Sequence, residues 1–355
     1  MPLIHQKVLS AITRCRTGLL GGVHYRCDDC GRDHWVGRSC GNRHCPNCGK
    51  EKSARWLEKM SPRLLPVHHF LVTFTVPLQV GSVLRSRQKA GYRALFDAGA
   101  ESLRDCASAT KSLRNAQLGF FGVLHTWGRD PMIYHPHVHF VVPGGGVSED
   151  GTQWKATPEN FFLHHATLIR VYKAKLADQL RAAGLYDSVP AGAWDKRFVV
   201  DIKPVGDGRA VLKYLAPYVN RVAISDSRIT ACDESSVTYR YTPSGTSQSK
   251  TRTVPGDEFV RGFLQHSLPK GLQKIRYYGW MSPNSRVHLD AVKWLVWLFL
   301  GWTFWLGSGH APQEQPDPPS ILRCGQCGGS MRVVEVTFTP RLVLSDPSLA
   351  YFDSS

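Results

Sequence analysis

One segment, residues 135–146, constrains this chain most strongly. It reads HPHVHFVVPGGG, an apolar and β-branched run from His137 that is followed by a proline and three glycines. This composition predicts a buried strand that stops at Pro143. Because strand side chains alternate between faces, His137 and His139 point the same way, about 7 Å apart along the backbone. Two neutral imidazoles on a rigid strand form a metal platform, although core or surface histidines can share this spacing.

The preceding segment predicts a partner for this strand. Residues 118–127 read as a second strand, and residues 128–131 turn the chain back towards the histidines. The two strands can therefore pair antiparallel. Such pairing brings His125 within reach of the other two imidazoles and makes it the candidate third ligand. The alternatives for that role are His135, His164 and His165.

Hydrophobic periodicity predicts the other elements. Strands are expected at residues 67–76 and 197–203, and a basic hairpin at 237–241 and 249–254, followed by an amphipathic stretch at 258–265. Helices are expected at residues 83–107, 161–183 and 209–222. Strands that pair in runs, interspersed with helices, indicate an α+β fold.

The amino-terminal cysteines have the spacing of zinc ligands. Ten cysteines in a chain with no secretory signal pattern at residues 1–14 favour metal binding over disulfides, in a cytoplasmic protein. Two Cys-x-x-Cys knuckles, separated by fourteen residues, match a ribbon in which four thiolates hold one tetrahedral ion. The predicted ligands of this structural zinc are Cys27, Cys30, Cys45 and Cys48. The neighbouring Cys40 and His44 leave open a shuffled set or a second, poorer site.

The carboxy-terminal part is less informative. Residues 294–306 are very apolar but too short to span a bilayer comfortably, which predicts a buried or interface helix. A Pro-, Gln- and Asp-rich linker follows at residues 310–320. Cys324 and Cys327 form a further knuckle without an evident mate, which either completes a site with distant ligands or is a degenerate remnant.

The charge of the chain indicates a polyanionic partner. Its 44 Lys and Arg face 28 Asp and Glu, a formal net charge of +16. Such an excess favours nucleic acid or an anionic membrane surface. Basic residues around the amino-terminal knuckles favour DNA, and no membrane partner is expected. In the basic region from residue 233 onwards, the predicted DNA contacts are Arg252, Lys274 and Arg276.

A tyrosine pair completes the set of candidate residues. Tyr214 and Tyr218 stand four apart, hence on one helical face, although Pro217 between them kinks a helix. Alone, such a pair is more typical of amphipathic packing. Beside a bound divalent ion, however, a tyrosine hydroxyl is a usable nucleophile towards a DNA phosphodiester.

These motifs together resemble the HUH endonuclease superfamily in its two-tyrosine branch. The wider pattern is similar to that of rolling-circle insertion-sequence transposases, whose amino-terminal cysteine-rich zinc domain matches residues 27–48. The resemblance runs from about Cys27 to Gly279. It rests on VTFTVP (72–77), VLHTWG (123–128), HPHVHFVVPGGG (135–146), KYLAPYVNRVAIS (213–225) and LPKGLQKIRYYG (268–279).

The resemblance implies a central antiparallel sheet with the histidine strand in its middle and helices flanking it. It implies His137 and His139 as ligands of catalytic Mg²⁺ or Mn²⁺, and Tyr214 and Tyr218 as nucleophiles, although some related transposases use one tyrosine. Related replication initiators carry a basic residue where this chain has Pro217. The nearest substitutes here for that phosphate contact are Lys213 and Arg221.

The resulting hypothesis is a DNA transposase that cleaves and rejoins single-stranded DNA through a metal-assisted 5′-phosphotyrosine intermediate. Host replication machinery is an indirect partner, and the expected location is the bacterial cytoplasm at the nucleoid. The alternatives are a replication initiator or relaxase with the same chemistry, a non-catalytic zinc DNA-binding protein and, more weakly, a zinc hydrolase. The predicted segments are a zinc domain (1–60), a catalytic domain (61–232), a basic extension with an apolar helix (233–307) and a flexible tail (308–355).

Overall fold

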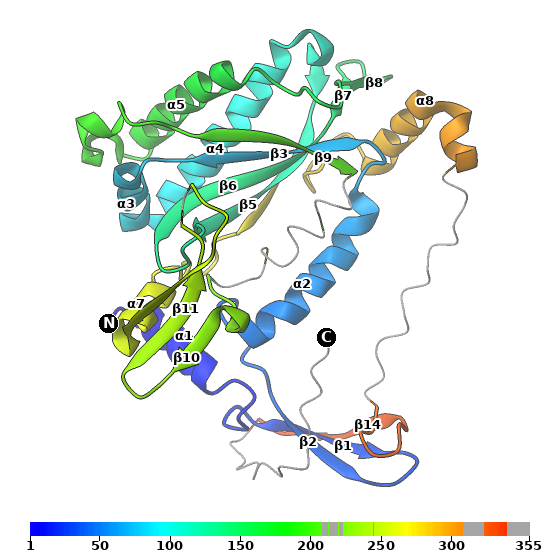
Figure 1. The fold of residues 1–355 in the computed structure, drawn as a ribbon. Coiled ribbons are helices and arrows are strands. Elements are labelled where there is room, and N and C mark those ends of the chain that lie inside the picture. Colours follow the sequence, from blue (N-terminus) through cyan, green and yellow to red (C-terminus); the bar gives the residue numbers. More distant parts are fainter. Residues whose placement is uncertain (208–211, 213–218, 220–222, 244, 308–322, 339–355) are drawn as a thin grey trace. The chain divides into compact units, whose positions relative to one another are not determined.

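The computed structural model describes residues 1–207, 212, 219, 223–243, 245–307 and 323–338 (Figure 1). The chain divides into two compact units. The larger unit is Lys52–Phe304, and the smaller unit combines Met1–Glu51 with Trp305–Ser355. Both ends of the chain therefore contribute to one unit, and the segment between them forms the other.

A five-stranded sheet organises the larger unit. Its strand order is β13-β5-β6-β3-β9, and every neighbouring pair is antiparallel. The strands are β3 (His68–Thr75), β5 (Gly119–Trp127), β6 (Tyr134–Pro143), β9 (Val200–Asp207) and β13 (Ile275–Gly279). The predicted central antiparallel sheet, with the histidine strand in its middle, is confirmed.

One face of this sheet is covered by helices α4 (Gln88–Ser108) and α5 (His165–Ala182) (Figure 1). Phe140 of β6 is fully buried there, and its ring contacts those of Phe74, Phe96 and Phe120 at centroid distances of 5.6, 6.4 and 5.5 Å. Removing so large a buried side chain typically costs about 3–5 kcal/mol. Even-numbered residues of β6 thus anchor the strand, and its odd-numbered residues face the other way.

The opposite face carries Leu71, Val123 and Val141. It also carries His125, His137 and His139, and we call it the histidine face. These apolar residues belong to a second buried cluster, which also contains Leu212 and Val219. Val292 and Val296 of α8 (Leu289–Gly307) join the same cluster. Apolar packing therefore fills one part of this face, and the histidines lie further along strands β5 and β6.

The histidine strand β6 stops at Pro143, as predicted. The glycines that follow have a packing role, and Gly145–Ser148 forms a new strand, β7, in a separate small sheet with β4 (Ala116–Gln117) and β8 (Trp154–Ala156). A Cβ at Gly144 would collide with the His68 ring, and one at Gly145 with Trp154. Glycine is needed at these two positions because the His68 and Trp154 side chains pack directly against the backbone.

The predicted helix over residues 83–107 is two helices, α3 (Leu78–Ser86) and α4, because Arg87 between them has non-helical torsions. The basic hairpin is confirmed as β11 (Ser236–Tyr241) and β12 (Lys250–Pro255), with an additional strand β10 (Ile229–Cys232). Helix α7 (Gly256–Leu264) follows. Single 3₁₀ turns occur at Ser61–Arg63, Lys111–Leu113, Tyr186–Ser188, Ala191–Ala193 and Asp226–Arg228.

The smaller unit contains helix α1 (Leu3–Thr13) and a three-stranded sheet of order β14-β1-β2. Its strands are β1 (Gly22–Cys27), β2 (Asp33–Gly37) and β14 (Met331–Val336). Helix α2 (Pro46–Met60) begins in this unit. The prediction of a flexible tail from residue 308 is thus wrong for β14, which pairs antiparallel with β1.

The very apolar segment lies in α8, where Gly301 adopts a positive φ of 70° and interrupts the helix. Val292 and Val296 are buried, whereas Trp294, Leu298 and Phe299 are more than half exposed. Across the described part of the chain, none of the helices has the length and apolarity needed to cross a bilayer.

Candidate metal centres

Three histidines meet on the histidine face. His125 of β5 pairs directly with His137 of β6, and His139 follows two residues later on the same side. The ring centroids are 5.3 Å apart for His125–His137, 4.7 Å for His125–His139 and 4.8 Å for His137–His139. One ring nitrogen from each lies within 4.8 Å of the others, a spacing that allows one ion to be held between them.

Hydrogen bonds orient two of these rings. His137 Nδ1 lies 2.8 Å from the carbonyl oxygen of His135, so Nδ1 donates and Nε2 keeps its lone pair. His139 Nδ1 lies 2.8 Å from the hydroxyl of Thr73 on β3. Partners of this kind fix the orientation and tautomer of metal-binding histidines.

Burial keeps the three rings neutral. Desolvation, followed by the neighbouring histidines, holds the pKa of His125 and that of His137 well below the ordinary value. Burial lowers the pKa of His139 to about 4, although Asp201 opposes the shift. Neutral imidazole is the form that binds a cation, so the cluster is in its metal-binding state at neutral pH.

The rival histidines lie outside this cluster. His135 is close, with its ring centroid 5.3 Å from that of His137, but it contributes its carbonyl to orienting that ring. His165 contacts the carbonyl of Val200, and the His164 ring packs on Phe161. Among the candidates, the structure therefore brings His125 together with the pair on β6.

The predicted DNA contacts fall in different places. Lys274 Nζ lies 4.8 Å from the ring centroid of Trp127, which stacks on His125, so this cation is beside the cluster. Arg252 is 2.8 Å from Asp130 in an ion pair. Arg276 points to the helix-covered face, where it pairs with Asp97 of α4 at 3.3 Å. Tyr214, Tyr218, Lys213 and Arg221 lie outside the described residues.

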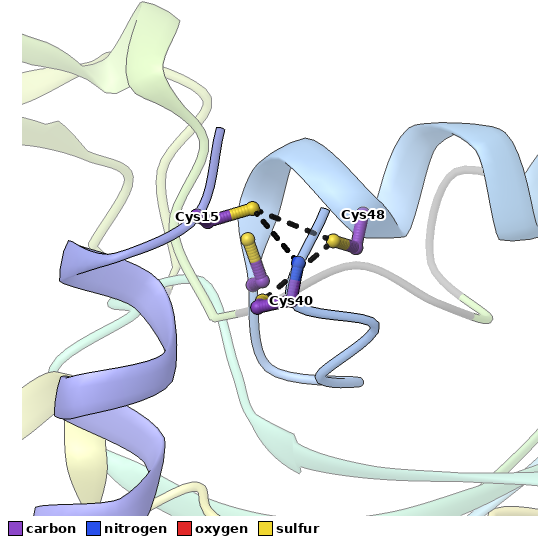
Figure 2. A group of neighbouring side chains, drawn as sticks. Cys15, Cys40 and Cys48 are labelled. Atoms are coloured by element: carbon purple, nitrogen blue, oxygen red, sulfur yellow. Dashed lines mark hydrogen bonds between the residues drawn. The ribbon is translucent and has the colours of Figure 1, made fainter. Parts of the chain in front are cut away.

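Cysteines of the smaller unit form two groups of four. The first contains Cys15, just after α1, together with Cys40, Cys45 and Cys48. Cys48 Sγ lies 3.7 Å from both Cys15 Sγ and Cys40 Sγ, and the thiols converge from separate segments (Figure 2). A tetrahedral zinc ion with Zn–S distances of about 2.3 Å separates its sulfurs by roughly 3.8 Å, so the spacing fits zinc.

The second group contains Cys27, Cys30, Cys324 and Cys327. The single predicted site of Cys27, Cys30, Cys45 and Cys48 is therefore wrong, because the two amino-terminal knuckles belong to different clusters. The Cys27 knuckle ends strand β1, whereas Cys45 and Cys48 lie at the start of helix α2. His44 is in neither group.

Cys15 was not predicted as a zinc ligand from the sequence, because an isolated cysteine has no ligand spacing of its own. The end of α1 places it beside Cys40. All three Cys-x-x-Cys knuckles are followed by glycine, so the sequence does not show which two share an ion, but in the structure the two knuckles of the second group form the same turn. Both glycines, Gly31 and Gly328, adopt a positive φ (69° and 76°). Gly49 after Cys48 is helical instead.

Two family models match this chain. The model described as "Transposase zinc-binding domain" matches residues 1–76, and the one described as "Putative transposase" matches residues 119–287. "Putative transposase y4qJ" of Sinorhizobium fredii is 37% identical over 301 residues, covering 79% of this chain and 75% of the relative. "Transposase for insertion sequence element IS801" of Pseudomonas savastanoi pv. phaseolicola is 26% identical over 302 residues, covering 79% and 70%. No solved structure matches the chain.

An α+β domain with a histidine cluster, joined to a zinc-binding domain, defines a metal-binding protein that processes DNA. The chain belongs to the IS91-type transposase family that the two matching domains describe. This confirms the resemblance to insertion-sequence transposases with an amino-terminal zinc domain. DNA is its substrate and structural zinc its cofactor.

Proposed function

We propose that this transposase is a metal-dependent, single-strand DNA transesterase that moves an insertion element by a rolling-circle route. His125, His137 and His139 would hold Mg²⁺ or Mn²⁺, and Tyr214 and Tyr218 would be the nucleophiles. The observation that carries the proposal is the largely buried, neutral three-histidine cluster on neighbouring strands of the sheet. A divalent ion held there would withdraw charge from the scissile phosphate and orient it.

In the proposed step, a tyrosine hydroxyl oxygen attacks the phosphorus and loses its proton. The bond from phosphorus to the 3′ oxygen breaks, and that oxygen takes up a proton to become a free 3′ hydroxyl. The strand remains attached through a 5′-phosphotyrosine, which retains the bond energy for a second transesterification without ATP. The free 3′ hydroxyl would be available to host polymerase.

Core packing supports the assignment of the tyrosines. Leu212 and Val219 are each 1% exposed and belong to the buried cluster of the histidine face. Tyr214 and Tyr218 lie between these two residues in the sequence. The proposal is thus supported by two described residues, one on each side of the tyrosines in the sequence, that pack on the face that bears the histidines.

Transposition is favoured over plasmid replication or conjugation because the chain belongs to a transposase family. Lys274, beside His125, would contact a phosphate near the cluster. Arg252 and the basic hairpin would hold more distant DNA. The proposed DNA substrate supports the bacterial cytoplasm as the location of the reaction.

A covalent-adduct assay tests the proposal. Purified protein is incubated with labelled single-stranded DNA spanning an element end, with Mn²⁺ or with chelator, and run on a denaturing gel. A shifted band that needs Mn²⁺ and maps by mass spectrometry to Tyr214 or Tyr218 is expected. DNA binding without any adduct would favour the non-catalytic binder, and metal-dependent cleavage without an adduct would favour a hydrolase.

The Thr73 hydroxyl gives a prediction of its own. Thr73→Val removes the oxygen that lies 2.8 Å from His139 Nδ1, and we expect Mn²⁺ affinity at the cluster to fall about 10- to 100-fold. Thr73→Ser keeps the hydroxyl and should restore affinity. Thr75→Val is the matched control, because the Thr75 hydroxyl donates to the Val199 carbonyl rather than to a histidine. Equal loss in both valine variants would point to a general effect on β3.

Acid should release Mn²⁺ from the histidine cluster only well below pH 7. A lowered pKa preserves the neutral, metal-binding ring above that pKa and loses it as the pH falls through it. Because the pKa of His139 is about 4, Mn²⁺ affinity should stay nearly constant down to about pH 5, where that ring is still mostly neutral. It should then decline towards pH 4, as measured by Mn²⁺ titration. A midpoint at or above pH 6.5 would contradict this account.

A further inference from the structure

We propose a second structural zinc site, formed by Cys27, Cys30, Cys324 and Cys327, that joins the two ends of the chain. The family zinc-binding model covers residues 1–76, so it contains all of the Cys15 group but only half of these four ligands. The inference goes beyond the transesterase chemistry and does not depend on it.

The first support is the spacing of the sulfurs. Cys27 Sγ lies 3.4 Å from Cys327 Sγ, and Cys30 Sγ lies 3.8 Å from Cys324 Sγ. All four thiols lie within 4.8 Å of one another. Four thiolates around a tetrahedral zinc ion are separated by roughly 3.8 Å, whereas a disulfide needs about 2.05 Å. The contacts cross-link the two knuckles rather than pairing cysteines within one.

The second support is that the two knuckles have the same backbone. In each, the glycine after the second cysteine donates to the carbonyl of the first: Gly31 to Cys27 at 3.0 Å and Gly328 to Cys324 at 2.8 Å. In each, the first cysteine N–H also donates to the carbonyl five residues on, at 2.9 Å for Cys27 and 2.8 Å for Cys324. Two matching turns that aim their thiols at one point form a built site.

The third support is the sheet that holds the knuckles together. Strand β1 leads into the first knuckle and β14 leads out of the second, and the two strands pair antiparallel with Cys27 opposite Met331. Asp28 N–H donates to the Ser330 carbonyl at 2.9 Å and extends this contact into the turns. A zinc ion here would close a loop of 300 residues between Cys27 and Cys327.

The consequence is a zinc domain built from both termini. In the sequence, the larger unit (Lys52–Phe304) is inserted between the two halves of that zinc domain. The carboxy-terminal knuckle is a required part of the zinc domain rather than a degenerate remnant. Because loop-closure entropy grows with loop length, a cross-link at this position strongly constrains the unfolded chain. Loss of the carboxy-terminal knuckle should therefore lower the stability of the amino-terminal part of this zinc domain.

Thiol protection in the wild-type protein tests the site without any substitution. Cys30 and Cys327 are exposed, so as free thiols they should react with iodoacetamide as quickly as exposed Cys232. We expect mass spectrometry to show both protected while Cys232 is labelled, and both to become reactive together on adding a zinc chelator. Immediate labelling without chelator, or a disulfide between the knuckles, would overturn the proposal.

Zinc content provides the matched variant test. Cys327→Ser should reduce bound zinc by one ion per chain relative to wild type, as measured by elemental analysis. Cys327→His supplies another zinc ligand and should restore it, and Cys232→Ser should leave the content unchanged. If Cys327→Ser folds and retains the wild-type zinc content, the requirement for all four cysteines is wrong, because His34 Nε2 lies 3.6 Å from Cys324 Sγ and would then be the fourth ligand. Should that variant fail to fold, the labelling pattern of the wild type decides.

Discussion

Replacing His137 and His139 together with alanine should abolish metal-dependent DNA cleavage, lowering the rate by at least about 10³-fold. Charge stabilisation by a bound cation contributes several kcal/mol, and about 1.4 kcal/mol corresponds to each factor of ten. Both rings belong to the cluster, with centroids 4.8 Å apart, so the variant removes two of the three proposed ligands. Single-turnover cleavage of an element end across Mn²⁺ concentrations measures the effect.

The control for this prediction is His164→Ala, since His164 is exposed and lies outside the cluster. The double variant should retain its zinc, because both cysteine groups lie in the other unit. Loss of zinc together with activity would mean that the structural and catalytic metals have been interchanged. Normal cleavage by the double variant would remove the histidines from the mechanism.

Replacing Tyr214 and Tyr218 together with phenylalanine should eliminate the covalent adduct while leaving DNA binding intact. Phenylalanine keeps the ring but lacks the attacking oxygen, so no phosphotyrosine can form and strand cleavage should fall by at least about 10³-fold. Gel-shift binding and adduct formation, measured on the same DNA, separate the two effects.

The single variants divide the roles of the tyrosines. If one tyrosine cleaves and the other serves the second transesterification, one single variant should lose the first adduct and the other only the rejoined product. Tyr186→Phe is the control, because its ring stacks on Trp194 rather than belonging to the candidate site. A double variant that still nicks DNA normally would exclude the tyrosine mechanism.

Local patterns in the sequence were sufficient for the core of the histidine site. Alternation along β6 places His137 and His139 on one face, and a short connection pairs β5 with β6, which brings in His125. The same rule explains Arg276: Ile275 faces the histidine side, so the next residue must point to α4. That consequence needed the register of β13, which the sequence did not supply.

Ligand sets and domain grouping were decided by the tertiary structure. Cysteine spacing predicted that this chain binds zinc, but spacing cannot tell which knuckles share an ion, because knuckles of equal length are interchangeable in sequence. Only the packing of α1 brings Cys15 to Cys40, and only the pairing of β1 with β14 brings Cys324 to Cys30. Contacts between residues 300 positions apart depend on the folding of everything between them, and local propensity does not encode that separation.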